Sequence, residues 1–195
     1  MLLLFDIDGV VNKADYFTEA YQNDFGVSKD VFDDFFQNHF PVTLTNEKDL
    51  ATILPAFFQN WQWKKTSAEF MDYWFQNDVK FDVELILLIR HYRRLGIRVG
   101  LASQQEKYRM NYLLNTAGLA DEFDCFYFSC ELGYLKSDSN FYRTISKLEQ
   151  EAIYFWDDTS CVVDLANDCG WTAFLYHDNL VLKEQIDRIL AVHEL

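Results

Sequence analysis

The strongest constraint on the fold is a regular alternation of short apolar segments with amphipathic segments along most of the chain. Five apolar runs rich in aromatic and β-branched residues predict β-strands at positions 2–7, 97–101, 123–128, 153–156 and 172–176. Apolar residues recur at helical spacing over positions 83–95, 106–117, 140–150, 160–169 and 181–192. Strands that alternate with helices predict a parallel sheet that is covered by helices on both faces.

A long segment, residues 13–80, interrupts this alternation. It is too long for an unstructured loop in a compact domain, so we expect it to fold on its own. Its apolar residues recur at helical spacing in four groups, 17–25, 32–40, 50–61 and 70–75. We therefore predict a Rossmann-like α/β core formed by residues 1–12 and 81–195, with a small all-helical cap domain at residues 13–80.

Capping and helix-breaking residues support these four helices. Ser28 is a candidate N-cap of the second helix, and Pro41 ends that helix. Thr66 and Glu69 form a capping-box pattern before the fourth helix. Pro55 either kinks the third helix or restarts it.

The same segment is rich in aromatic side chains, among them Phe36, Trp61, Trp63 and Trp74. At helical spacing such residues favour the hydrophobic core of the segment itself. The alternative is that some of them stack on a sugar or a base of a substrate. The sequence alone does not identify a substrate.

Composition and charge exclude several classes of protein. With 31 acidic and 17 basic residues the chain has a formal charge of -14, so we expect neither nucleic acid nor an anionic membrane as a partner. The four cysteines form no CxxC pair, which argues against a zinc or redox site and favours reduced thiols. The first residues include no basic leader, and no run reaches 18 apolar residues, so a cytoplasmic protein is expected.

Two acidic residues, Asp6 and Asp8, follow the first predicted strand and precede Gly9. A glycine there lets the backbone approach a ligand closely. On its own this pair is weak evidence, because aspartates often form an Asx-type turn where a strand ends.

A second acidic pair, Asp157 and Asp158, follows the fourth predicted strand. One of these residues could instead cap the next helix. In parallel sheets, however, ligands bind beyond the carboxyl ends of the strands, where both pairs are expected to meet. Because converging carboxylates raise one another's pKa values unless a cation is present, the two pairs predict a divalent ion, with Mg²⁺ favoured.

Two further segments supply groups that suit an anion. Ser103 and Gln104 follow the second strand, where a hydroxyl and a backbone N–H could hold a phosphate oxygen, although a serine in this position is commonly only a helix cap. Lys136 lies in a polar loop just before a helix. Most lysines are solvated on the surface, but one beside clustered acids stays charged and neutralises them.

Taken in order along the chain, Asp6-x-Asp8-Gly9-Val10, Ser103, Lys136 and Asp157-Asp158 resemble the four motifs of the haloacid dehalogenase-like hydrolase superfamily. The resemblance covers essentially the whole chain and is to phosphatase-type members with a helical cap after the first strand. It departs from the common pattern at Ser137, where members usually have proline, but no reacting group is lost.

The resemblance implies a role for each of these residues. Asp6 would be the nucleophile that attacks phosphorus, and Asp8 the general acid and then the general base. Mg²⁺ would be bound by the Asp6 carboxylate, the Asp8 backbone carbonyl and Asp158, with Asp157 acting through a water molecule. Gly9, Ser103, Gln104 and Lys136 would bind the phosphoryl group, with Ser103 and Lys136 also taking part in catalysis.

We therefore predict a Mg²⁺-dependent phosphatase that hydrolyses a small phosphorylated metabolite through an aspartyl-phosphate. A carboxylate nucleophile divides the steep barrier of phosphate monoester hydrolysis into two lower ones. The alternatives are a phosphomutase of the same superfamily and a catalytically silent regulatory protein that only binds phosphate. Asp8 argues against the silent protein, because a binding module has no use for a proton donor. The oligomeric state is not predicted.

Overall fold

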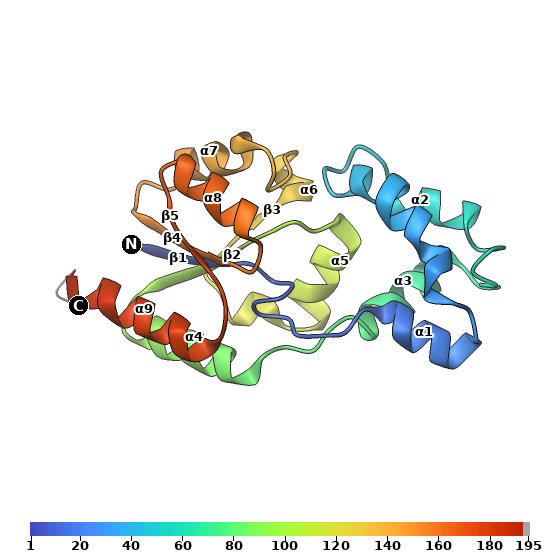
Figure 1. Cartoon of the computed structure of the whole chain (residues 1–195), viewed down its shortest axis with the longest axis horizontal. Helices are drawn as coiled ribbons and strands as arrows, with labels where there is room; N and C mark the ends of the chain where they lie inside the picture. Colours follow the sequence, from blue (N-terminus) through green and yellow to red (C-terminus); the bar gives the residue numbers. More distant parts are fainter. Residues whose placement is uncertain (193–195) are drawn as a thin grey trace.

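Five parallel strands form the central sheet of the computed structural model, which describes residues 1–192 (Figure 1). They are β1 (Leu2–Phe5), β2 (Arg98–Ser103), β3 (Cys125–Phe128), β4 (Ile153–Asp157) and β5 (Thr172–Leu175). Their order is β3-β2-β1-β4-β5, so the winding of the chain reverses between β1 and β4. The predicted strands and the parallel α/β sheet are confirmed. Ligands bind beside such a reversal in other parallel sheets.

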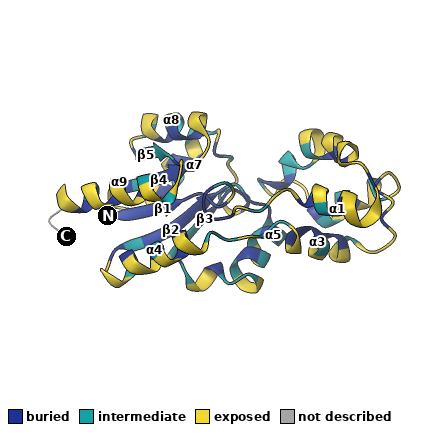
Figure 2. Cartoon of the chain, turned by 60° about the horizontal axis from the view of Figure 1, so that its bottom comes forward, coloured by how far each residue is buried: buried dark blue, intermediate teal, exposed yellow. Residues whose placement is uncertain are grey.

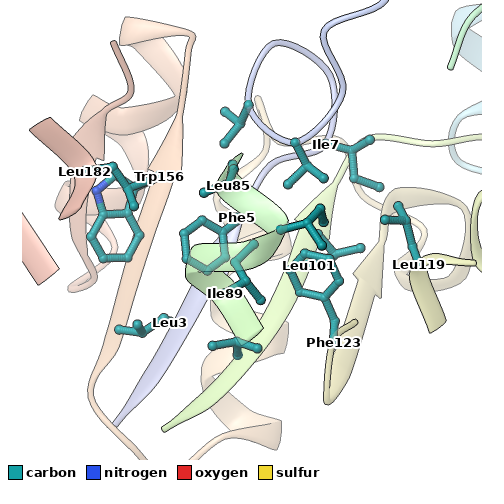
Figure 3. Packing of buried hydrophobic residues seen from close by; sticks show 14 of the residues in the cluster. Leu3, Phe5, Ile7, Leu85, Ile89, Leu101, Leu119, Phe123, Trp156 and Leu182 are labelled. Carbon is teal, nitrogen blue, oxygen red and sulfur yellow. The ribbon is translucent and has the colours of Figure 1, made fainter. Parts of the chain in front are cut away.

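Alternate side chains of β1 enter two different hydrophobic layers. Leu3 and Phe5 lie on the face covered by α4 (Val83–Arg94) and α9 (Asn179–Val192), whose leucines and isoleucines Figure 3 shows around them. Leu2 and Leu4 lie on the face covered by α7 (Ser139–Leu148) and α8 (Ser160–Asp168). Because both faces are covered, the inner strands β1, β2 and β4 are almost entirely buried, whereas the edge strands β3 and β5 are partly exposed (Figure 2).

Two features of the core were not predicted. The helix expected at 106–117 is an α-helix, α5 (Lys107–Asn111), that widens into a π-helical turn, η5 (Tyr112–Thr116). The short helix α6 (Ser129–Leu132) and the 3-10 turn η6 (Leu119–Asp121) are too short to show a helical period in the sequence. Within residues 1–192, no helix combines the length and the apolar character that crossing a bilayer requires.

The segment 13–80, here called the helical insert, stands beside the sheet as a separate group of helices (Figure 1). Its α-helices are α1 (Phe17–Phe25), α2 (Leu50–Ile53) and α3 (Ser67–Gln76). Shorter helical turns lie between them, namely η1 (Lys29–Phe32), η2 (Phe35–His39), η3 (Pro41–Thr43) and η4 (Leu54–Ala56). Trp61, Trp63 and Trp74 are buried in its own aromatic core, as the periodicity predicted, whereas Phe36 is only partly buried.

The second and third helices of the insert are less regular than predicted. The segment 29–39 is helical throughout but changes from 3-10 to α to π pitch, and the hydroxyl of Ser28 makes no capping hydrogen bond within the described chain. The helix that begins at Leu50 ends at Ile53, because Pro55 has no N–H to continue it, and the chain goes on as a 3-10 turn. The capping box of Thr66 and Glu69 is present as predicted.

Two short segments connect the insert to the core and pair with each other. The Lys13 N–H donates to the Lys80 carbonyl at 2.8 Å, and the Asp82 N–H donates to the Val11 carbonyl at 2.9 Å. Asn12 lies between Val11 and Lys13 in the chain, and its Oδ1 accepts a hydrogen bond from the Lys80 N–H at 2.7 Å. This paired neck begins three residues after Asp8, so it places the insert beside the carboxyl ends of the strands.

Candidate active site

The end of β1 is aligned with the end of β4. Phe5 pairs with Trp156, and the Asp6 N–H donates to the Trp156 carbonyl at 2.9 Å, so Asp6 lies level with Asp157. Asp6 is 4% exposed and Asp157 is fully buried. The parallel register thereby brings together two acids that are about 150 residues apart in the sequence.

Gly9 allows the two acidic pairs to approach. Its φ angle is +82°, and a Cβ atom at this position would lie 1.9 Å from an Asp158 carboxylate oxygen. Any other residue would therefore displace Asp158 as well as strain the backbone. The glycine was predicted to let the backbone approach a ligand closely. In the structure it lets the backbone approach the Asp158 carboxylate.

Lys136 lies between the two buried acids. Its Nζ is 2.8 Å from Asp6 Oδ2 and 2.7 Å from Asp157 Oδ2. Burial alone would lower the pKa of Lys136, but the two carboxylates raise it, so the ammonium stays charged. Burial raises the pKa of Asp6 to about 7, because Lys136 compensates only partly for the loss of solvent and for the charge of Asp157.

The loop that carries Lys136 is fixed without the proline that is common after such a lysine. The Lys136 N–H donates to Gln104 Oε1 at 3.2 Å, and the Tyr142 hydroxyl donates to the Lys136 carbonyl at 2.7 Å. Ser137, the next residue, is exposed and lines the cavity of the site. These two hydrogen bonds fix the N–H and the carbonyl of Lys136, one on each side of its Cα atom.

The acidic residues fit a hard divalent cation. Carboxylate oxygens of Asp6, Asp157 and Asp158 lie within 4.8 Å of one another. Asp6 Oδ1 is buried and has no hydrogen-bond partner within residues 1–192, so one of its lone pairs is available to a ligand. Lys136 alone does not balance three carboxylates. Mg²⁺ prefers oxygen ligands. The three carboxylates supply them, and Asp6 Oδ1 has a lone pair available.

Nearly all of the predicted site residues line one cavity of about 750 Å³ at the carboxyl ends of the strands. Its walls include Asp6, Asp8, Gly9, Ser103, Gln104, Lys136 and Asp158. Asp157 is buried behind them and reaches the site through Lys136. Ser103 is buried, and its hydroxyl is 3.1 Å from Gln105 Nε2. The structure therefore brings together the residues that the motifs predicted.

Asp8 has partners that the sequence did not reveal. The guanidinium of Arg109 binds it with both ends, from Nη1 to Oδ2 at 2.7 Å and from Nη2 to Oδ1 at 2.8 Å. Asn12 and Gln105 donate further hydrogen bonds to its two oxygens at 3.0 and 2.8 Å. Arg109 Nε is also 3.1 Å from Asp78 Oδ2. In the sequence, Arg109 is an ordinary residue of a helical pattern.

This arrangement sets the protonation of Asp8. Burial alone would raise its pKa, but the charge and hydrogen bonds of Arg109 lower it to about 2. Asp8 is therefore ionised at neutral pH, which suits a proton acceptor. To donate a proton, the carboxyl must leave Arg109. The pair thus links the proton chemistry of the site to α5 and, through Asp78, to the helical insert.

A buried glutamate at the start of α5 gives a pH-dependent prediction. Glu106 accepts a hydrogen bond from the Arg109 N–H, and its second oxygen, Oε2, is buried without a partner among the described residues. Burial raises the pKa of Glu106 from 4.5 to about 7. The folded state therefore favours the neutral acid, and this stabilisation is complete below pH 4.5 and lost as the pH rises through 7.

We expect Glu106→Gln to stabilise the protein at pH 8 by up to about 3 kcal/mol and to change little at pH 4.5. The amide keeps the acceptor for Arg109 and has no charge to bury. Urea unfolding at the two pH values measures the difference. The matched control is Glu69→Gln at the exposed start of α3, where hydrogen bonds lower the pKa of the carboxylate and no gain at high pH is expected. A glutamine variant that loses stability at pH 8 would contradict the prediction.

Comparison with known proteins gives matches among solved structures only. No family model matches the chain, and no curated protein matches its sequence. The HAD family enzyme BT-2542 from Bacteroides thetaiotaomicron, solved in complex with magnesium and inorganic phosphate, has a TM-score of 0.77 at 16% identity, over 91% of this chain and 94% of that one. A predicted HAD-like family hydrolase from Porphyromonas gingivalis has a TM-score of 0.75 at 17% identity, over 97% of both chains.

A third similar structure is the L-2-haloacid dehalogenase from Xanthobacter autotrophicus, solved with chloropropionic acid covalently bound. Its TM-score is 0.66 at 12% identity, over 96% of this chain and 82% of that one. At these identities the likeness concerns the fold. Structures with this fold were solved with different bound molecules, inorganic phosphate in one case and chloropropionic acid in another.

Proposed function

Since this chain has the fold of the haloacid dehalogenase-like hydrolases, we propose that it is a Mg²⁺-dependent phosphatase acting on a small phosphate monoester through an aspartyl-phosphate. One observation carries the proposal. Asp6, with a free buried oxygen, shares one cavity with Asp8 and Asp158 and is held by Lys136. These residues supply a nucleophile, a proton-transfer group, a cation site and a fixed positive charge.

Each residue has a defined task in the proposed reaction. The Asp8 carboxyl first leaves Arg109 and takes up a proton from solvent. The Asp6 carboxylate then attacks phosphorus, and the bond from phosphorus to the leaving oxygen breaks as that oxygen takes the proton from Asp8. Asp8, ionised again, then accepts a proton from the water that attacks the aspartyl-phosphate. Ser103 and Lys136 hold the phosphoryl oxygens. Mg²⁺, held by Asp6, Asp158 and the Asp8 carbonyl, with Asp157 acting through water, would offset the charge of the phosphate and the carboxylates.

Phosphoryl transfer is favoured over dehalogenation by two features of the site. A halide leaves without a proton, so Asp8 and its network would serve no purpose in a dehalogenase. The cluster of Asp6, Asp157 and Asp158 calls for a cation, and the similar enzyme BT-2542 was solved with magnesium and inorganic phosphate. We also propose that the helical insert acts as a cap over this site. All four cysteines are free thiols, in keeping with the proposed cytoplasmic location.

The proposal predicts Mg²⁺-dependent release of inorganic phosphate. With a panel of phosphorylated metabolites and aryl phosphates, we expect turnover in the presence of Mg²⁺, loss of most of it when the metal is removed by a chelator, and recovery when Mg²⁺ is added back. The reason is that Asp6 and its acidic neighbours repel a phosphate dianion unless a cation offsets their charge. Release that is unaffected by the chelator would contradict the proposed cation site.

The products of the same panel distinguish the alternatives. A phosphomutase would return the phosphoryl group to another hydroxyl of a hexose phosphate and release little free phosphate. A regulatory protein without activity would bind phosphate esters and convert none of them. Product analysis by chromatography therefore separates all three functions in a single experiment.

A further inference from the structure

A second cavity, of about 490 Å³, adjoins the active-site cavity on the side of the helical insert. Tyr16 and Asp78 line both cavities. Arg109 lines the second cavity and binds Asp8, which lines the first. In the proposed reaction the leaving oxygen lies at Asp8, so the organic part of the substrate extends from that point. The second cavity begins where this part of the substrate would lie.

The wall of this cavity is built from aromatic rings of the insert. They are Tyr16, Phe17, Phe32, Phe36, Phe40 and Trp74. Trp74 is the centre of the group, with ring centroids of Phe17, Phe36 and Phe40 at 5.0, 5.4 and 5.4 Å. Phe17, Phe32 and Trp74 are buried in the core of the insert, whereas Phe36 and Phe40 are half-buried and Tyr16 is 81% exposed. A rigid aromatic wall thus has three rings that a ligand can reach.

Ion pairs occupy three charged side chains of the wall, Lys29, Asp78 and Arg109. Asp78 Oδ2 lies 3.1 Å from Arg109 Nε. Lys29 lies 3.5 Å from Glu19 in an ion pair on the surface. Most of the wall that a ligand meets in this cavity is therefore aromatic. A sugar, whose hydroxyl groups would lose water and find few partners, is disfavoured.

Acidic side chains at this cavity disfavour a second anionic group. Asp30 and Asp33 are exposed there, and Asp15 lies beside Tyr16 on the wall of the active-site cavity. A bisphosphate, a nucleotide or a substrate with a carboxylate would bring like charges together at this point. An uncharged organic group meets no such repulsion.

From these observations we infer that the aromatic cavity binds the organic part of the substrate, and that this part is an uncharged aromatic or cyclic apolar group. The inference rests on the proposed phosphatase function and adds a substrate class to it. The substrate is then the phosphate monoester of an apolar alcohol or phenol. The ester bond lies at Asp8, and the ring lies against Tyr16, Phe36 and Phe40.

Two substrates that differ in little besides polarity test the inference. Cyclohexylmethyl phosphate and glycerol 3-phosphate are both esters of primary alcohols, so their leaving groups have similar reactivity, but only the first has an apolar ring. We expect kcat/KM to be at least about tenfold higher for the cyclohexylmethyl ester, because several apolar carbons are buried in the cavity. Equal values, or a preference for the glycerol ester, would overturn the inference.

A pair of variants then locates the selectivity. Phe36→Ala should lower the ratio of the two kcat/KM values about tenfold, and Phe36→Leu, which keeps apolar bulk, should restore most of it. The matched control is Phe58→Ala, which removes another half-buried ring of the insert that packs on Trp61 and Phe70 and lies outside the cavity. The control should leave the ratio unchanged. Equal ratios in all variants would show that the cavity does not select the substrate.

Direct binding separates failure of the inference from failure of the proposed function. The probe is 2-naphthol, a neutral product analogue, added to the metal-free protein and followed by its fluorescence. We expect saturable binding that Phe36→Ala weakens and Phe58→Ala does not. Binding of this kind without any phosphatase activity would uphold the apolar site and reject the phosphatase. Phosphatase activity without such binding would uphold the phosphatase and reject the apolar site.

Discussion

Asp6→Asn is expected to lower the turnover of phosphate esters by more than about a thousandfold while leaving the fold intact. An amide oxygen is a poor nucleophile, and it cannot form the acyl phosphate on which the proposed mechanism depends. The fold should survive because asparagine has the same shape and Lys136 keeps its ion pair with Asp157 at 2.7 Å. Burial raises the pKa of Asp6 to about 7, so removing this charge relieves a cost in the folded state above that pH.

Three measurements check this expectation. The first is kcat with Mg²⁺, and the second is the midpoint of thermal unfolding, which should not fall. The third is mass spectrometry of quenched reactions, in which a phosphoryl adduct should appear on the peptide that contains Asp6 in the unmodified protein and be absent from the variant. Asp168→Asn, at the exposed end of α8, is the control for a surface acid and should keep the adduct. A variant that retains most of the Mg²⁺-dependent hydrolysis would exclude Asp6 as the nucleophile.

The sheet and its acidic edge could be predicted because their signals are local and repeated. Each strand is a short apolar run, and motif residues lie at the ends of three of them, Asp6 after β1, Ser103 at the end of β2 and Asp157 at the end of β4. Parallel pairing then forces the ends of the strands to meet. Neither step requires knowledge of a contact between distant side chains, so the sequence was sufficient for both.

The irregular helices of the insert could not be predicted, because their shape depends on contacts between segments. Trp61 is fully buried and stacks on Phe32 and Phe70, with ring centroids 4.7 and 5.1 Å away. Rings as large as these set where the backbone of 29–39 and of 54–63 must pass, and the helical pitch adapts to them. Apolar spacing indicates which face of a segment is buried, but it does not give the pitch.

Arg109 shows the same limit within the site. Its partners Asp8 and Asp78 are 101 and 31 residues away in the chain, and no motif marks an arginine at this position. What places it there is the start of α5, which Glu106 caps, together with the neck that brings Asp78 back to β1. Motifs therefore identified the proposed reacting groups, whereas Arg109, which lowers the pKa of Asp8, emerged only from the structure.

Asp8→Asn is expected to cause the second largest loss of activity. The kinetics of this variant test the proposed double role of Asp8 as general acid and general base. With esters of poor leaving groups, kcat should fall by roughly a hundredfold to ten-thousandfold, because the leaving oxygen receives no proton. With 4-nitrophenyl phosphate, whose leaving group needs no proton, the first step should continue. The second step should still be slow, since no base remains to activate water. The result expected is a burst of about one nitrophenol per active site followed by very slow turnover.

The network around Asp8 supplies the control for this experiment. Asp78 Oδ2 lies 3.1 Å from Nε of the buried Arg109. Asp78→Asn therefore also removes a carboxylate that pairs with this guanidinium, but it keeps Asp8 as the proton-transfer group. Rapid mixing with 4-nitrophenyl phosphate should show a burst for Asp8→Asn and none for Asp78→Asn. If both variants gave a burst, the slow second step would come from displacing Arg109 and not from loss of the base. If neither did, and Asp8→Asn turned over steadily, Asp8 would have no part in hydrolysis of the aspartyl-phosphate.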